Sequence, residues 1–170
     1  MGAWLLGIKF TTSLTEISNP VLKELVQYWQ TLDPDPIIPH RQQFNPVEIP
    51  HCLRHIILID VVEGTPRYFI RLAGTSLSPA YQRSITGCYV EDILSDSDRA
   101  EIIEQYDHSV KHQQPTYMKS TADVLSGERL QYERVILPMT TNGTDADKLL
   151  VGLLFFNVKQ HLMHRPSFKL

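Results

Sequence analysis

The chain of 170 residues is 42% hydrophobic and 21% charged, the proportions of a soluble globular protein rather than of a disordered or fibrous one. Its 16 basic and 19 acidic residues give a formal net charge of −3, so it has no basic excess with which to bind nucleic acids through their phosphates. Two cysteines, Cys52 and Cys88, are too few for a disulfide framework. We therefore expect a cytoplasmic protein of one domain.

Residues 1–18 are expected to form an N-terminal arm that packs on the domain that follows. The apolar run from Ala3 to Ile8 is too short for the core of a signal peptide and far too short to span a membrane. The domain is predicted over residues 19–158, and residues 159–170 are predicted to be a polar C-terminal tail.

The first regular element is an amphipathic helix over residues 19–32. Asn19 is a typical N-cap residue, Pro20 suits the first helical position, and the helix must end before Pro34. This helix either covers its own domain or associates with a second copy or a partner protein, and we predict the dimer or partner surface. The apolar residues at helical spacing are Leu22, Leu25, Val26, Trp29 and Leu32.

The clearest strands are residues 56–62 and 67–72, which form a hairpin around a turn that contains Gly64. A register centred on this turn brings Asp60 within reach of Arg71 and Arg67, and we predict a structural ion pair between Asp60 and Arg71. The opposite face of the hairpin is wholly apolar and consists of Ile57, Ile59, Val61, Tyr68, Ile70 and Leu72.

A second helix is predicted from Ser95 to His112, and three strands follow over residues 116–125, 129–137 and 149–156. The first and last predicted strands are apolar at both odd and even positions, which is typical of central strands in a sheet covered on both faces. The order of elements predicts an α+β domain with one five-stranded antiparallel sheet and helices between its second and third strands. The apolar stripe of the second helix is Ile102, Ile103, Tyr106 and Val110.

A series of short motifs resembles the PAS fold, and more closely a divergent PAS family of small single-domain bacterial proteins. The most distinctive motif is the run Arg-Leu-Ala-Gly-Thr at residues 71–75. The others are Glu48-Ile49-Pro50, residues 57–61, residues 66–70, Thr86-Gly87-Cys88-Tyr89, residues 132–138 and Gly152-Leu153. Their order and spacing carry the resemblance.

The resemblance implies that a ligand, where there is one, lies between the sheet and the helices. Arg134 alternates with Tyr132 and Ile136, and it would hold an anionic ligand if this face of its strand turns inward. The same side chains can instead fill the space completely as core. The candidate pocket residues are Ile57, Ile59, Tyr68, Ile70, Leu72, Tyr81, Tyr106, Met118, Tyr132 and Arg134.

The cofactors of well-known PAS classes fit this sequence poorly. Haem-binding members commonly present a histidine from the long helix, but His108 and His112 lie off the predicted apolar stripe, so we expect them in solvent. Neither Cys52 nor Cys88 lies in the motif of light-sensing flavin domains. We therefore predict neither haem nor covalent flavin and leave the ligand unknown.

Metal binding and catalysis have no strong signal either. His51, Cys52 and His55 are close in sequence but lack the fourth ligand of structural zinc, and no known catalytic motif occurs. We predict a sensory or regulatory PAS module that binds a small ligand, a protein partner or both, and that signals in trans without an output domain. Two alternatives remain, a small α+β enzyme with an unrecognised pocket and a ligand-free adaptor.

Overall fold

The computed structural model describes residues 9–34, 36–125 and 127–156, and its centre is one antiparallel sheet with the strand order β1-β4-β5-β6-β2-β3. β2 pairs with β6, which confirms that the first and last predicted strands are central neighbours. The sixth strand, β1, was missed and pairs with the outer side of β4. The strands are β1 (Phe10–Thr11), β2 (Ile56–Val61), β3 (Tyr68–Ala73), β4 (Thr116–Asp123), β5 (Arg129–Met139) and β6 (Lys148–Phe156).

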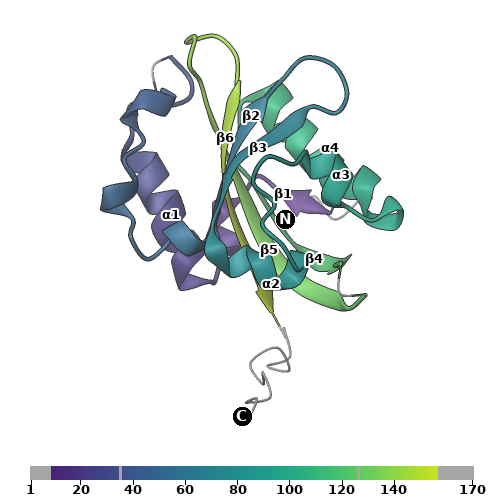
Figure 1. Cartoon of the computed structure of the whole chain (residues 1–170). Helices are drawn as coiled ribbons and strands as arrows, with labels where there is room; N and C mark the ends of the chain where they lie inside the picture. Colours follow the sequence, from purple (N-terminus) through teal and green to yellow (C-terminus); the bar gives the residue numbers. More distant parts are fainter. Residues whose placement is uncertain (1–8, 35, 126, 157–170) are drawn as a thin grey trace, which may run out of the picture.

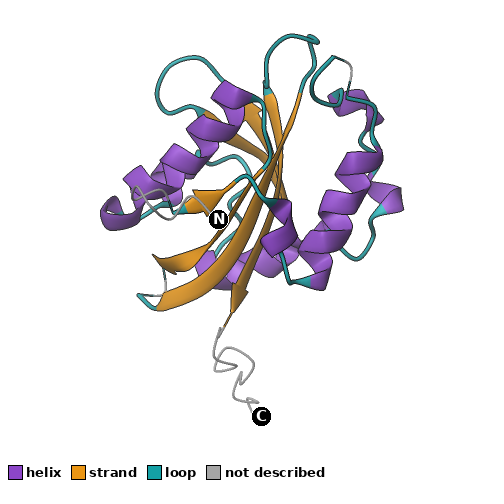
Figure 2. Cartoon of the chain, turned by 180° about the vertical axis from the view of Figure 1, so that it is seen from behind, coloured by secondary structure: helices purple, strands orange, loops and turns teal. Residues whose placement is uncertain are grey.

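Helices cover both faces of the sheet (Figures 1 and 2). α1 (Pro20–Thr31) lies on one face, and α2 (Ser78–Tyr81), α3 (Val90–Ile93) and α4 (Asp96–His112) lie on the other. Each face has its own hydrophobic core, because β5 and β6 are buried on both sides. Single 3-10 turns occur at Leu14–Glu16, Arg41–Gln43, Pro46–Glu48, Leu53–His55 and Thr75–Leu77.

The tail at 159–170 and the first eight residues of the arm lie outside the described residues. Residues 9–18 of the arm contain β1, and they pack on the domain as predicted because Phe10 enters the core beneath α4. No helix in the described ranges is long and apolar enough to cross a membrane.

The leading helix begins where the sequence predicts. Oδ1 of Asn19 accepts a hydrogen bond from the backbone nitrogen of Val21 at 2.9 Å, and Pro20 occupies the first turn. These contacts satisfy backbone groups that a helix start otherwise leaves unpaired.

The apolar face of α1 packs on the chain's own sheet. It lies so close to β6 that a Cβ added at Gly152 would be 2.7 Å from a methyl carbon of both Leu22 and Leu25. Nε1 of Trp29 donates a hydrogen bond to the carbonyl of Pro138 at 3.1 Å. The sheet already buries Leu22, Leu25 and Val26, so these three residues are not available as the predicted dimer or partner surface. Trp29 and Leu32 are only partly buried.

The β2–β3 hairpin follows the predicted register only in part. Ile59 pairs with Ile70 as predicted, but a bulge then places Leu72 opposite Leu58 instead of Ile57. Since a shift of one residue turns a side chain to the other face, Leu72 points outward and is 46% exposed. Leu72 is therefore not a pocket residue.

The predicted ion pair between Asp60 and Arg71 is confirmed. Nε of Arg71 donates to Oδ2 of Asp60 at 2.9 Å, and Nζ of Lys148 donates to Oδ1 at 2.8 Å. Burial alone would raise the pKa of Asp60, but the hydrogen bonds and charges of Lys148 and Arg71 outweigh it and lower the pKa.

The glycine of the distinctive motif allows a close approach between two segments of backbone. The nitrogen of Gly74 donates to the carbonyl of Ile56 at 2.8 Å, and an added Cβ would lie 2.4 Å from the carbonyl oxygen of Arg54. Only glycine fits at this contact, which anchors the end of β3 beside the start of β2.

Candidate functional site

The most polar point of the interior is Arg134 in β5, on the sheet face covered by α4. Its side chain is only 4% exposed, so this face turns inward. Nε donates to Oε1 of Gln105 in α4 at 2.8 Å. The guanidinium carbon lies 5.0 Å from the ring centroid of Tyr132 and 5.3 Å from that of Tyr106, which are cation–π distances.

A chain of buried hydrogen bonds holds Gln105 in place. Its Nε2 donates to Oγ1 of Thr116 at 3.1 Å, and that oxygen lies 2.7 Å from Oγ of Ser109. All three side chains are fully buried, and each has a partner. These hydrogen bonds hold the amide oxygen of Gln105 toward Arg134 and connect α4 to β4.

The charge of Arg134 is not balanced by a carboxylate. A guanidinium stays protonated in proteins. Among the described residues, every ion pair is formed by a cation other than Arg134, so no carboxylate there pairs with its guanidinium. A cation–π contact contributes about 2 kcal/mol when desolvated, whereas burying an ion costs several kcal/mol. The amide and the rings therefore offset only part of the cost of burying this cation.

Two tyrosine rings, Tyr106 and Tyr132, pack on the guanidinium, and a third tyrosine, Tyr81, lines the same cavity. Tyr132 donates to the sulfur of Met118 at 2.9 Å, whereas Tyr81 and Tyr106 have no hydrogen-bond partner among the described residues. Burial raises the pKa of Tyr106 to about 12, and burial likewise raises the pKa of Tyr81. The nearby charge of Arg134 opposes both increases. Both phenols are thus protonated at neutral pH.

A small cavity lies beside these groups, and its volume is about 20 Å³. This is room for about one water molecule. Asp123 is the one acidic residue among its lining residues, and its carboxylate is exposed and paired with Arg129 at 3.0 Å. The cavity is lined by Tyr81, Ile93, Leu94, Ile102, Ala122, Asp123, Val124, Tyr132, Arg134, Leu153 and Phe155.

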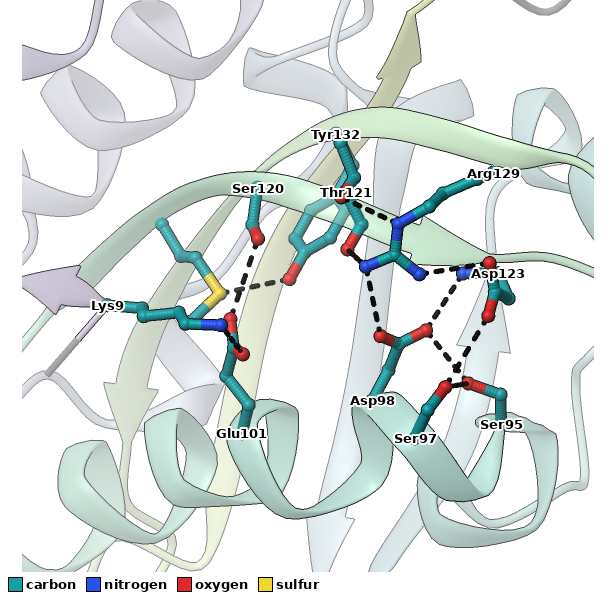
Figure 3. A network of polar contacts seen from close by, with 11 residues as sticks. Lys9, Ser95, Ser97, Asp98, Glu101, Ser120, Thr121, Asp123, Arg129 and Tyr132 are labelled. Carbon is teal, nitrogen blue, oxygen red and sulfur yellow. Dashed lines mark hydrogen bonds and ion pairs between the residues drawn. The ribbon is translucent and has the colours of Figure 1, made fainter. Parts of the chain in front are cut away.

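A second polar network holds the β4–β5 hairpin against α4 next to Tyr132 (Figure 3). Asp98 accepts hydrogen bonds from the hydroxyl of Ser95 and from the backbone nitrogen of Asp123, both at 2.8 Å. Burial would raise the pKa of Asp98, but these hydrogen bonds and Arg129 outweigh it and lower the pKa. The network keeps one wall of the cavity in position.

A much larger groove, of about 1220 Å³, is open to solvent between α4 and the β2–β3 hairpin. Its polar groups are largely engaged within the protein. Oε1 of Glu91 accepts a hydrogen bond from the backbone nitrogen of Arg67 at 2.6 Å, and Tyr68 donates to Asp107. We place the candidate site at the smaller cavity because the unbalanced charge lies there.

Four of the predicted pocket residues line the cavity or the open groove, and five others lie in the core. Tyr81, Tyr132 and Arg134 line the cavity, and Tyr68 lies at the open groove. The remaining buried members fill the surrounding core, and they are Ile57, Ile59, Ile70, Tyr106 and Met118.

The sequence interpretation missed the polar residues that orient Arg134. The buried face of α4 is centred between Ile102 and Ser109 rather than on Ile103 and Val110, which are only partly buried. A search from Ile102 at the spacing i, i+3, i+4 and i+7 that allows polar residues would have included Gln105.

His108 is partly buried, whereas the sequence pattern predicted that it would lie in solvent. Its ring packs on Phe10 with centroids 4.9 Å apart and on His112 at 4.4 Å, and its Nε2 is buried without a hydrogen-bond partner among the described residues. Burial and the neighbouring His112 lower its pKa. His108 nevertheless packs on β1 and is not a lining residue of the cavity.

The three residues considered for zinc each contact a different neighbour. His51 lies 3.6 Å from a carboxylate oxygen of Glu24, and Nδ1 of His55 lies 2.8 Å from Oγ of Ser76. Cys52 is buried, and burial raises the pKa of its thiol to about 11. Among residues 9–34, 36–125 and 127–156, no three His, Cys, Asp or Glu side chains form a cluster suited to a metal ion.

Comparisons with known proteins agree with this architecture. A family model described as a PAS domain matches residues 17–155. No curated protein matches the chain.

Similar solved structures include light-oxygen-voltage (LOV) domains. One, studied with a flavin analogue, has a TM-score of 0.54 at 10% identity, and the match covers 69% of this chain and 88% of that one. The LOV protein of Rhodobacter sphaeroides has a TM-score of 0.51 at 12% identity, with 63% and 61% covered. The LOV domain of the blue-light photoreceptor aureochrome1 has a TM-score of 0.50 at 8% identity, with 66% and 89% covered. At these identities the likeness shows the fold alone.

Proposed function

Because the chain belongs to the PAS-domain family, we propose that it is a sensory or regulatory module that binds a small ligand and passes the signal to a partner protein in trans. The ligand lies between the sheet and the helices α2 to α4. PAS domains are sensory modules that bind ligands or partner proteins. We propose further that this module is cytoplasmic, is not an enzyme and has no nucleic-acid partner, in keeping with its net charge of −3.

The observation that carries this proposal is the buried, unbalanced cation beside a cavity. An interior built only for stability would use apolar side chains of the same volume, because replacing buried charges in this way is often neutral or stabilising. Arg134, with its amide partner Gln105 and the two polar residues that hold this amide, is instead a costly arrangement placed where a ligand can use it. Polar groups converging on an interior cavity are typical of binding sites.

The surrounding elements offer a route from the cavity to the surface. Tyr81 belongs to the four-residue helix α2, which ends at Gln82 in the left-handed conformation with φ of 56°. The ring of Tyr81 packs edge-on against Phe155 with centroids 5.8 Å apart. A ligand that moves this pair changes the outer surface of α2 and the end of β6, which a partner protein can recognise.

Native mass spectrometry of the purified protein tests the proposal. We expect a small molecule that remains bound under native conditions and is lost on denaturation, and the same spectrum reports whether the protein is a dimer. If the native protein carries no such molecule, and if no compound from a metabolite library raises its unfolding temperature, the ligand-binding proposal is wrong.

A ligand-free adaptor is the second candidate, and one observation favours it. The cavity of about 20 Å³ leaves little space, because side chains fill nearly all of the interior between sheet and helices. A ligand-free adaptor has no ligand that could move Tyr81. If the protein is such an adaptor, hydrogen exchange in α2 is therefore the same with and without candidate ligands.

A further inference from the structure

Arg134 brings hydrogen-bond donors to the cavity that have no strong acceptor among the described residues. The guanidinium has five N–H groups, and Nε alone bonds to an oxygen or nitrogen atom among the described residues. One terminal nitrogen of the guanidinium contacts only the weakly accepting sulfur of Met118, at 3.5 Å. The hydroxyls of Tyr81 and Tyr106 also lack a partner there, and the charge of Arg134 acts on both.

Acceptors are scarce at the same place. The carbonyl oxygen of the Gln105 amide is occupied by Nε of Arg134, and Thr116 and Ser109 bond to each other. The one carboxylate among the cavity-lining residues, that of Asp123, is exposed and paired with Arg129. A positive, donor-rich and acceptor-poor cavity is complementary to an anion.

The remaining walls of the cavity are apolar, which narrows the class of anion. Ile93, Ile102, Val124 and Leu153 line it together with the ring of Phe155. A phosphate would bring more negative charge than one guanidinium balances, and it would leave oxygens against these apolar side chains. A short alkyl chain packs favourably against these apolar side chains.

We propose that the cavity binds a small monocarboxylate of about one to three carbons, whose oxygens accept hydrogen bonds from Arg134 and from the hydroxyl of Tyr81. This inference rests on the proposed ligand-binding function and specifies its ligand class. The cavity of about 20 Å³ has room for about one water molecule, so the alkyl part enters by displacing the Tyr81–Phe155 ring pair. Binding is thereby coupled to a movement of α2.

Titration of the full chain with three compounds tests the ligand class. Sodium propionate is compared with propionamide, which has nearly the same shape without the charge, and with sodium chloride at equal ionic strength. We expect propionate alone to bind saturably in calorimetry, and to raise the unfolding midpoint by about 5 °C at about 100 times its Kd. An equal response to propionamide or chloride overturns the inference, as does the absence of any response to formate, acetate and propionate.

Two variants test the site, and a third serves as a control. Tyr81→Phe removes one hydroxyl and keeps the ring, so we expect propionate to bind about tenfold more weakly while the unliganded protein stays folded. Arg134→Met should abolish binding. Tyr89→Phe removes the hydroxyl of a tyrosine that packs on Phe69 outside the cavity, and it should bind propionate like the wild type.

The outcomes separate this inference from the proposed function. Wild-type affinity in Tyr81→Phe refutes the site, whether or not Arg134→Met folds. If propionamide binds as tightly as propionate and Tyr81→Phe weakens both, the cavity takes a neutral ligand, so the inference fails and the proposed function stands. If no carboxylate binds, the inference fails, and the proposed function fails with it when native mass spectrometry finds no ligand and no library compound raises the unfolding temperature.

Discussion

Nε of Arg134 and Oε1 of Gln105 lie 2.8 Å apart inside the protein, although the two residues are 29 positions apart in the chain. The contact joins β5 to α4, and the amide of Gln105 also bonds to Thr116 in β4. One side chain thus holds three elements around the candidate site.

Replacing Gln105 by Leu is expected to destabilise the protein by about 2–4 kcal/mol, because the variant leaves the buried Nε of Arg134 without its acceptor and removes one of the two hydrogen bonds of the buried Thr116 hydroxyl. Urea unfolding at neutral pH measures the loss. Gln27→Leu, at an exposed position of α1, is the matched control and should change stability by about 0.5 kcal/mol or less. Equal effects of the two changes would show that the buried contact contributes nothing.

Gly152→Ala is expected to cost about 1–3 kcal/mol, because the new methyl group would lie within 2.7 Å of side-chain carbons of Leu22 and Leu25 in α1. A double-mutant cycle with Leu25→Val measures the coupling by chemical denaturation. Shortening Leu25 should recover part of the loss caused by the alanine. Strict additivity of the two changes would contradict the packing of α1 on β6.

Asp60 is expected to stabilise the protein above pH 4 and to lose this contribution in acid. Its folded pKa is lower than the usual value, so the contribution is complete above the unfolded pKa of about 3.9 and disappears as the pH falls through the folded pKa. Asp60→Asn should therefore lower stability by about 1 kcal/mol at pH 7 and by less at pH 3. Unfolding curves at both pH values test this, with Asp92→Asn at an exposed position as the control. A loss that is the same at both pH values would exclude the ion pair as its cause.

His108 should make the protein less stable at pH 5.5 than at pH 7.5. Burial and His112 lower its folded pKa, so the unfolded chain binds the proton more readily and stability falls as the pH drops below about 6.5. Lys111 also lowers this pKa, and Glu104 opposes the decrease. Phe10, which packs on the ring from β1, has no charge to contribute.

His108→Phe preserves an aromatic contact with Phe10 and should remove most of this pH dependence. Urea unfolding at pH 5.5 and 7.5 measures the stability of each variant. His112→Gln should remove only the part of the pH dependence that arises from the effect of His112 on the pKa of His108. A His108→Phe variant with the full pH dependence of the wild type would assign the effect to other histidines.

The sequence predicted those parts of the fold that depend on local chemistry. Asn19 and Pro20 start α1 where expected, and the strands that are apolar on both faces, β2 and β6, lie side by side at the centre. The predicted register is correct near the turn of the hairpin, where few residues separate the strands. It fails beyond Ile59, because a bulge costs little locally and leaves no pattern in the sequence.

Features that depend on packing between distant segments were not predictable in the same way. β1 has two residues, too few for an alternating pattern, and it exists because β4 offers an unpaired edge. The apolar stripe predicted for α4 does not include Gln105 and Ser109, because polar residues on a helix usually face solvent. Arg134 was found because it alternates with Tyr132 and Ile136, although its lack of a carboxylate partner was visible only in three dimensions.

Each margin of the sheet is covered over part of its length by another segment of the chain. At one margin β1 occupies the hydrogen-bonding groups at the start of β4. At the other, the nitrogen of Ile70 donates to the carbonyl of Cys88 at 2.9 Å, and the nitrogen of Gly87 donates to the carbonyl of Ile70 at 2.8 Å, so residues 87 and 88 cover the middle of β3. Exposed strand margins are templates for intermolecular β-pairing. Residues 87 and 88 block such pairing at the middle of β3, whereas β1 pairs with only Tyr117 and Met118 of β4. Association through a shared sheet is therefore disfavoured at the β3 margin.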